Sequence, residues 1–243
     1  MNQEERRKYL IRDLLEEQNQ KIDVPKDKLS QKMLLRGLMN IRMPRKTSEI
    51  FLNTQNVYLK QCLEDKGIVD LKNIQPIKED IYLWQGDITT LKCDAIVNAA
   101  NSQMLGCFIP NHRCIDNAIH TYAGIQLREE CNNLMKSLGR EAKTGEAFLT
   151  SAYNLPSKYV IHTVGPIVYA SLTEEDKNAL EKCYNSCLEL AESKKITSLA
   201  FCCISTGEFH FPNEEAAKIA IQTVLKYKEK TGSKLKVIFN VFK

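Results

Sequence analysis

One segment of the sequence, residues 105–116, concentrates side chains that could bind a metal ion. It places Cys107, His112 and Cys114 within eight residues. Two thiolates and one imidazole suit zinc by softness and by preferred geometry. Three protein ligands leave a fourth tetrahedral position open, which is typical of a catalytic rather than a structural site. The spacing has no CxxC pair, so the residues alone leave ordinary packing open as the alternative.

A carboxylate and two asparagines could act beside this segment. Asp116 lies just inside the start of a predicted helix over residues 115–138, where the helix dipole favours a negative charge. Asn98 and Asn101 flank two alanines directly after an apolar strand. Asparagine amides in that position can orient ligand hydroxyls, and alanines permit close approach. The alternative is that both asparagines only form a turn.

Two other junctions between strands and helices carry polar groups. Gly86 and Asp87 follow a strand, so they predict either a carboxylate presented to a ligand or an ordinary turn. Residues 205–212 contain two hydroxyls, a glycine and two aromatic rings before a helix. Successive N–H groups in such a loop form an anion nest, which favours a diphosphate over a generic loop that ends with Pro212 at the first helical position. The sequence contains neither GxGxxG nor a Walker-type lysine.

The elements that must position these residues alternate between strands and helices from residue 80 onward. Strands are predicted at 81–84, 95–97, 147–150, 159–163, 198–202 and 237–239, and helices at 115–138, 174–193 and 214–230. This alternation predicts a layered α/β sheet in which ligands bind at the carboxyl ends of the strands. We expect a domain over residues 76–243.

Residues 1–75 have a different texture and are predicted to form an N-terminal helical extension. Apolar residues recur at helical spacing, Pro25 and Pro44 separate the segments, and a third helix is expected to begin after Ser48 and end before Gly67. The extension has few β-branched runs and does not read as a unit that folds alone.

Composition excludes several classes of protein. The chain has 243 residues, a net charge of +4 and nine cysteines. The charge is too weak and too dispersed to argue for nucleic acid, and no apolar run is long enough to span a membrane. The charged N-terminus does not read as a secretory signal, so we expect a cytoplasmic protein with reduced thiols. Core packing is the expected role of four of them: Cys183, Cys187, Cys202 and Cys203.

The sequence resembles the macrodomain family, whose members bind ADP-ribose. The resemblance covers residues 80–243 in order, with five matching stretches: GDIT at 86–89, IVNAANSQMLG at 96–106, IDNAIHTYAG at 115–124, TGEAFLTSAYNLPSKYVIHTVGP at 144–166 and ISTGEFHFPNEEAA at 204–217. It implies a three-layer α/β/α fold around a mixed central sheet. Residues 1–75 lie outside it.

The resemblance also implies roles for individual residues. Asp87 would accept from the adenine amine and Ile88 would add a backbone contact. Asn101 would hold hydroxyls of the distal ribose, with Asp116 beside that ribose, and both are candidate catalytic residues. The rest of the implied ADP-ribose site comprises Asn98, Ile115, Asn117, Ser205, Thr206, Gly207, Glu208, Phe209 and Phe211.

One departure from the family pattern is large. Hydrolytic macrodomains commonly carry a run of glycines after the NAAN segment, whereas here only Gly106 remains and CFIPNHRC replaces the others. The segment resembles the zinc-containing branch of the family, whose members carry an N-terminal helical extension and remove ADP-ribose from proteins. The resemblance therefore implies one Zn²⁺ per chain, held by Cys107, His112 and Cys114.

The function implied is that of a glycosidase-class hydrolase that removes mono-ADP-ribose from ester-linked Asp or Glu side chains. Its expected partners are ADP-ribose and a mono-ADP-ribosylated protein, with a lipoyl-carrier protein suggested by the branch resemblance, and neither nucleic acid nor membrane. Two alternatives stay open. One is an ADP-ribose reader without turnover, and the other is a zinc–thiolate redox sensor in which oxidation ejects the metal.

Overall fold

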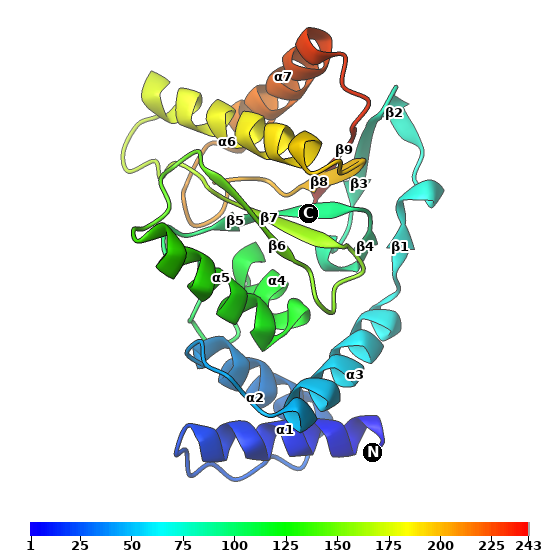
Figure 1. Ribbon diagram of the computed structural model, residues 1–243, viewed down its shortest axis with the longest axis vertical. Helices are drawn as coiled ribbons and strands as arrows, with labels where there is room; N and C mark the ends of the chain where they lie inside the picture. Colours follow the sequence, from blue (N-terminus) through cyan, green and yellow to red (C-terminus); the bar gives the residue numbers. More distant parts are fainter. Residues whose placement is uncertain (243) are drawn as a thin grey trace.

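A seven-stranded mixed sheet forms the centre of the computed structural model, which describes residues 1–242 (Figure 1). The strand order is β2-β3-β9-β8-β5-β7-β6. The five inner strands run parallel, while β2 and β6 are antiparallel to their neighbours at the two edges. The bounds are β2 (Pro76–Lys78), β3 (Ile81–Gln85), β5 (Ala95–Ala100), β6 (Ala147–Ser151), β7 (Tyr159–Val164), β8 (Ser198–Phe201) and β9 (Lys236–Val241).

Two pairs of helices cover the two faces of this sheet. Helices α4 (Ile115–Ala123) and α5 (Ile125–Leu138) lie on one face, and α6 (Glu174–Ser193) and α7 (Asn213–Thr231) lie on the other (Figure 1). Because both faces are covered, the central strands are buried along most of their length and are mainly apolar, as parallel strands usually are. Ala95, Ile96 and Val97 of β5, for example, are all fully buried. The predicted three-layer α/β/α fold is therefore confirmed.

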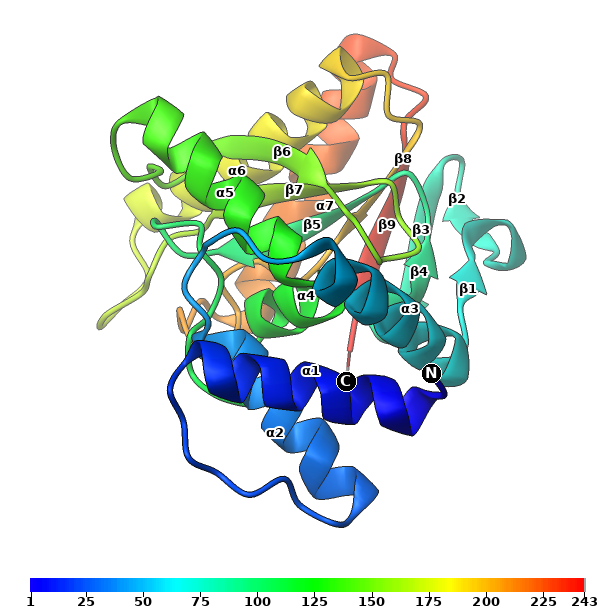
Figure 2. The same ribbon diagram turned by 60° about the horizontal axis from the view of Figure 1, so that its bottom comes forward.

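The N-terminal residues form a fourth layer of helices below α4 and α5, with α1 (Gln3–Glu17), α2 (Lys28–Ile41) and α3 (Glu49–Lys66) (Figure 2). Asn2 and Ser48 accept hydrogen bonds from the first turns of α1 and α3, which explains where these helices begin. The layer has its own hydrophobic core, separate from that of the sheet. Ile125 at the start of α5 closes this second core, so the layer is completed by the domain on which it sits.

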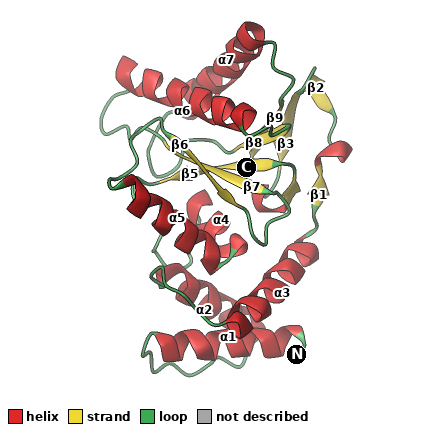
Figure 3. Cartoon of the chain, viewed as in Figure 1, coloured by secondary structure: helices red, strands yellow, loops and turns green. Residues whose placement is uncertain are grey.

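Three sequence predictions differ from the structure. Helix α3 ends at Lys66, as predicted, but residues 67–75 do not continue the helical layer: they include β1 (Val69–Asp70) (Figure 3) and a short 3₁₀ turn, η1 (Leu71–Asn73). Strand β1 pairs with β4 (Leu91–Lys92), and a second 3₁₀ turn, η2 (Ile88–Thr90), follows β3. The predicted helix over 115–138 is two helices, because Gly124 has a φ of 101° that no helix accommodates. Cys203 is exposed rather than buried, because β8 ends at Phe201 and leaves it in a loop.

The other three cysteines predicted to pack in the core, Cys183, Cys187 and Cys202, are buried. All nine cysteines are free thiols. Among residues 1–242, no helix combines the length and the apolar character that a membrane crossing requires.

The break at Gly124 generates a stability prediction. A Cβ at this position would lie 2.7 Å from Gln55 Nε2, in addition to the unfavourable φ. Gly124→Ala should therefore lower the free energy of unfolding by about 3 kcal/mol, since backbone strain and overpacking each cost about 1–3 kcal/mol. Gly139→Ala is the matched control, because its φ is also positive but nothing lies within 4 Å of the added Cβ. It should cost about 1 kcal/mol. Equal losses in urea unfolding would contradict this account.

Candidate active site

The three predicted metal ligands lie together at the loop between β5 and α4. Their ligand atoms, Cys107 Sγ, His112 Nδ1 and Cys114 Sγ, all lie within 4.8 Å of one another. The distance from Cys107 Sγ to His112 Nδ1 is 3.6 Å. A tetrahedral zinc ion with ordinary Zn–S and Zn–N bond lengths separates sulfur from nitrogen by about 3.5 Å. The donor set and its spacing therefore fit Zn²⁺.

Local geometry explains how the loop reaches this arrangement. Gly106 has a φ of 79°, and a Cβ there would lie 2.7 Å from the His120 ring, so only glycine fits. Cys114 is the N-cap of α4, and its Sγ accepts from the backbone N–H of Asn117 at 3.4 Å. Burial raises the pKa of the Cys114 thiol to about 12, despite this hydrogen bond. A cation between the two sulfurs would offset the cost of ionising them.

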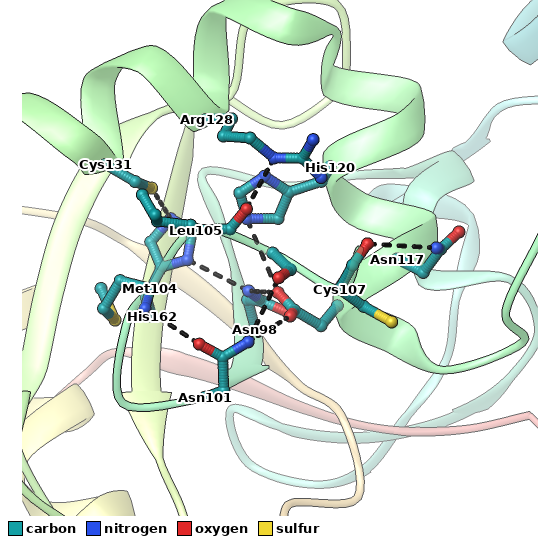
Figure 4. Close-up of polar contacts among 12 residues, drawn as sticks. Asn98, Asn101, Met104, Leu105, Cys107, Asn117, His120, Arg128, Cys131 and His162 are labelled. Atoms are coloured by element: carbon teal, nitrogen blue, oxygen red, sulfur yellow. Dashed lines mark hydrogen bonds and ion pairs between the residues drawn. The ribbon is translucent and has the colours of Figure 1, made fainter. Parts of the chain in front are cut away.

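Asp116 lies behind this loop and is almost completely buried. Its Oδ1 accepts from Asn98 Nδ2 at 2.8 Å, and its Oδ2 lies 3.5 Å from Asn101 Nδ2 (Figure 4). Burial raises the pKa of Asp116 to about 6, while the Asn98 hydrogen bond opposes this shift. The structure thus brings together the two candidate catalytic residues, Asn101 and Asp116, and Asp116 is the common neighbour of Asn98 and Asn101.

His162 of β7 supports this group from inside the sheet. Its Nδ1 lies 3.1 Å from Asn98 Nδ2 (Figure 4), and its Nε2 lies 2.9 Å from Thr150 Oγ1. Because the Asn98 amide can only donate, Nδ1 is the acceptor and Nε2 carries the proton. Burial lowers the pKa of His162 to about 3, so the ring is neutral.

A second cluster of possible metal ligands lies deeper, at His120, Cys131 and His162. It fits a metal less well. Both ring nitrogens of His162 already have hydrogen-bond partners, and burial raises the pKa of the Cys131 thiol. Burial, together with His162 and Arg128, also holds the pKa of His120 well below its usual value. Neither ring nitrogen of His120 has a hydrogen-bond partner among the described residues. We therefore interpret this cluster as neutral buried side chains.

The loop of residues 203–211 between β8 and α7 has the form expected of an anion nest. Within residues 1–242, the N–H groups of Gly207, Glu208 and Phe209 have no acceptor in the protein, whereas Phe211 N–H donates to the Ser205 carbonyl at 3.0 Å. This loop also contacts the loop of residues 107–114 that carries the predicted metal ligands, here called the metal loop, because Glu208 Oε1 lies 3.5 Å from His112 Nε2. A carboxylate on the far nitrogen of a metal-binding histidine orients its ring.

At the other end of the predicted site, Asp87 is held by more partners than the sequence suggests. Its Oδ1 accepts from the N–H and hydroxyl of Thr89, and its Oδ2 accepts from Lys66 Nζ at 2.8 Å. Burial acts to raise the pKa of Asp87, but Lys66 and Thr89 outweigh it and the pKa is lowered. Lys66 also lies 3.5 Å from the centre of the Tyr122 ring. Sequence reasoning missed Lys66, because α3 lies outside the motifs.

The remaining predicted residues divide by exposure. Thr206, Phe209 and Ile115 are half-buried, and Gly207 and Glu208 are exposed. Ile88, Ser205 and Phe211 are buried, although a backbone contact from Ile88 does not require an exposed side chain. Asn117 differs from expectation. Its side chain is fully buried and donates to the carbonyls of Cys107 and Ile109, so it supports the loop instead of facing a ligand.

A hollow of about 540 Å³ lies on the opposite side of the domain from the candidate site, near the amino ends of the parallel strands. Three of its four lysines have acidic partners, since Lys158 pairs with Asp94, and Lys72 and Lys92 pair with Asp70. None of the predicted site residues lines it.

Comparison with known proteins shows the family to which this chain belongs. The family described as Macro domain matches residues 97–220. A protein-ADP-ribose hydrolase of Treponema medium is 51% identical over 248 residues, covering 100% of this chain and 95% of that protein. A protein-ADP-ribose hydrolase of Staphylococcus aureus (strain MRSA252) is 48% identical over 241 residues, covering 98% of this chain and 90% of that protein.

Solved structures of macrodomains are also similar to this chain. The Trypanosoma brucei macrodomain in complex with ADP-ribose is similar with a TM-score of 0.66 and 31% identity, over 83% of this chain and 88% of that one. The Oceanobacillus iheyensis macrodomain with ADP is similar with a TM-score of 0.61 and 35% identity, over 70% of this chain and 86% of that one.

The contacts of Asp87 generate a binding prediction. Asp87→Ala should weaken ADP-ribose binding by about 1–3 kcal/mol, the usual cost of an unpaired buried polar group. Asp87→Asn should lose less, because it keeps an acceptor for Thr89 and removes only the charge. Asp70→Ala is the matched control, since Asp70 also caps a 3₁₀ turn and pairs with lysines, but on the opposite side of the domain. Wild-type affinity of Asp87→Ala by calorimetry would refute the adenine assignment.

Proposed function

This chain belongs to the macrodomain family, and on that premise we propose that it is a zinc-dependent hydrolase that removes mono-ADP-ribose from ester-linked Asp or Glu side chains. The general activity is supported by relatives named protein-ADP-ribose hydrolase, which match this chain over nearly its whole length at about half identity. The metal and the ester linkage are the finer parts of the proposal.

The observation that carries the proposal is the meeting of two loops. The metal loop and the loop of residues 203–211 approach through His112 and Glu208, with 3.5 Å between Nε2 and Oε1. The second loop offers unpaired N–H groups suited to a diphosphate. A ribose joined to that diphosphate would therefore lie close to Cys107, His112 and Cys114, with its anomeric bond near Asp116.

The three ligands would hold Zn²⁺, which when bound supplies an open coordination position that acidifies water or polarises a carbonyl. The chain's own residues do the positioning. Asn101 Nδ2 makes only long contacts, 3.2 Å to the Gly106 carbonyl and 3.5 Å to Asp116 Oδ2. A ribose hydroxyl offers a better acceptor and can replace them, so Asn101 would orient the sugar.

Asp116 would complete the arrangement as the group that orients the attacking water or accepts its proton. Its Oδ1 is fixed by Asn98, which leaves Oδ2 with the weaker contact. The neutral His162 holds the same Asn98 amide from behind. The buried carboxylate thus keeps one defined orientation toward the sugar side of the site.

The protein partner is proposed by chemistry and by branch resemblance. It would be a mono-ADP-ribosylated protein, and the branch suggests a lipoyl-carrier protein. We place this reaction in the cytoplasm, where nine free thiols stay reduced.

The metal proposal predicts about one zinc per freshly purified chain, because three soft ligands leave one position open. Cys107→Ala and Cys114→Ala should each lose most of the metal. Cys62→Ala is the control, since Cys62 lies in α3 outside the metal loop. Elemental analysis that finds no zinc in reduced wild-type protein would refute the cofactor assignment.

A second prediction separates chemistry from binding. His112→Ala should lower turnover at least about 100-fold, the scale of one catalytic electrostatic group. Affinity for ADP-ribose should stay within about tenfold, or about 1.4 kcal/mol, because the contacts around Asp87 and residues 205–209 remain. Circular dichroism must show that the variant is folded. A folded, zinc-free His112→Ala protein that releases ADP-ribose at the wild-type rate would exclude the zinc mechanism.

A further inference from the structure

Asn117 makes hydrogen bonds to three residues of the metal loop. Its Nδ2 donates to the carbonyls of Cys107 at 3.4 Å (Figure 4) and Ile109 at 3.1 Å, and its backbone N–H donates to Cys114 Sγ. One fully buried residue thus touches both ends of the loop. Its side chain holds the backbone at Cys107 and Ile109 and its main chain contacts Cys114 Sγ, so a group that orients Asn117 also orders the loop that carries the ligands.

The group that orients Asn117 comes from the N-terminal layer. Arg36 of α2 donates to Asn117 Oδ1 from Nε at 3.1 Å and from Nη2 at 2.7 Å. The same Nη2 donates to the carbonyl of His112 at 2.9 Å. A planar guanidinium can bind these two oxygens together, whereas an ammonium offers one point charge. The contact also fixes the Asn117 amide, since Oδ1 must face Arg36 and Nδ2 must face the loop.

Further contacts bring α2 against the loop. Asn40 Oδ1 accepts from the backbone N–H of Asn111 at 3.0 Å. Gly37 lies so close that an added Cβ would be 3.3 Å from Asn111 Nδ2. Arg128 then joins α2 to the start of the loop, because its guanidinium donates to carbonyls of Leu105, Met39, Asn40 and Arg42.

We infer that the N-terminal layer is part of the active site, and that Arg36 is the positioning residue that holds the Cys107–Cys114 loop through Asn117. The expected effect on zinc binding and hydrolysis rests on the proposed function, since an ordered loop holds its ligands ready to bind. The ordering of the loop by Arg36 rests on the hydrogen-bond geometry alone. No glycine run is needed in this loop, because α2 supplies the order from outside.

The test compares Arg36→Ala and Arg36→Lys with wild-type protein. Amide hydrogen exchange should accelerate about tenfold or more in residues 107–117 and stay unchanged in α6 and α7. Zinc affinity, measured by chelator competition, should fall about 10–100-fold, the usual effect of losing a group that orients a ligand. In hydrolysis, kcat should fall while KM and ADP-ribose affinity stay within about threefold. Arg36→Lys should lie between wild type and Arg36→Ala.

Two further variants act as controls. Arg45→Ala removes an arginine of the same layer whose contacts are to Glu17, and should leave all readouts at wild-type values. Asn117→Asp keeps an acceptor for Arg36 but loses both donors to the loop, and should loosen the loop as Arg36→Ala does. If Arg36→Ala does not fold, Arg36→Lys and Asn117→Asp decide the question.

The outcomes separate the two proposals. Wild-type exchange and zinc affinity in Arg36→Lys and Asn117→Asp would overturn the inference, even if the wild-type enzyme is an active zinc hydrolase. The opposite result is also informative. If the loop loosens in these variants while the wild-type protein carries no zinc and releases no ADP-ribose, the positioning role of Arg36 is supported and the proposed function is overturned.

Discussion

The structure depends on one buried guanidinium, that of Arg128, which joins the two hydrophobic cores. Its N–H groups donate hydrogen bonds to the carbonyl of Leu105 and to carbonyls at the end of α2. The last carbonyls of a helix have no partner within the helix itself. Burial lowers the pKa of Arg128 to about 10, so the group stays charged at neutral pH. The positive charge suits the carboxyl end of a helix dipole. Phe108 covers its face, with 4.3 Å between the ring centre and the guanidinium carbon.

With α2 fixed in this way, the N-terminal helices reach both ends of the candidate site. Arg36 holds Asn117 at the metal loop, and Lys66 at the end of α3 holds Asp87 at the predicted adenine end. The helical layer is therefore more than a cover for α4 and α5. The polar side chains of Arg36 and Lys66, although only partly buried, make defined hydrogen bonds, which specify a position more narrowly than apolar packing does.

Local sequence signals predicted most of the fold. The helix over 174–193 was predicted with its observed bounds, and Ser48 and Gly67 delimit α3 as expected from capping rules. The break at Gly124 was missed, and one of the contacts made there is long-range, because Gln55 of α3 accepts a hydrogen bond from the backbone N–H of Ile125. The family resemblance placed Asn117 in the ADP-ribose site, and its role in the loop also depends on a residue far away in the sequence. Its partner Arg36 lies 81 residues away, and no short-range pattern reports such a pair.

The site itself was predictable only in its parts. The spacing of Cys107, His112 and Cys114 left metal binding and ordinary packing both open; the structure shows that their ligand atoms lie within 4.8 Å of one another, and the metal stays a prediction. The meeting of His112 with Glu208 depends on two loops that are distant in the chain, so motif order alone could not give it. The same holds for Asn98, which the fold places between Asp116 and His162.

The central claim is that the metal loop makes this macrodomain protein a zinc-dependent hydrolase. Its most direct test follows release of label from a mono-ADP-ribosylated protein by native, chelator-treated and zinc-restored enzyme. The account predicts release by the native enzyme, loss of release after chelation and recovery with zinc, while the chelated protein still binds ADP-ribose. Unchanged release by folded, zinc-free protein would contradict the account, and so would ADP-ribose binding without release by zinc-loaded protein.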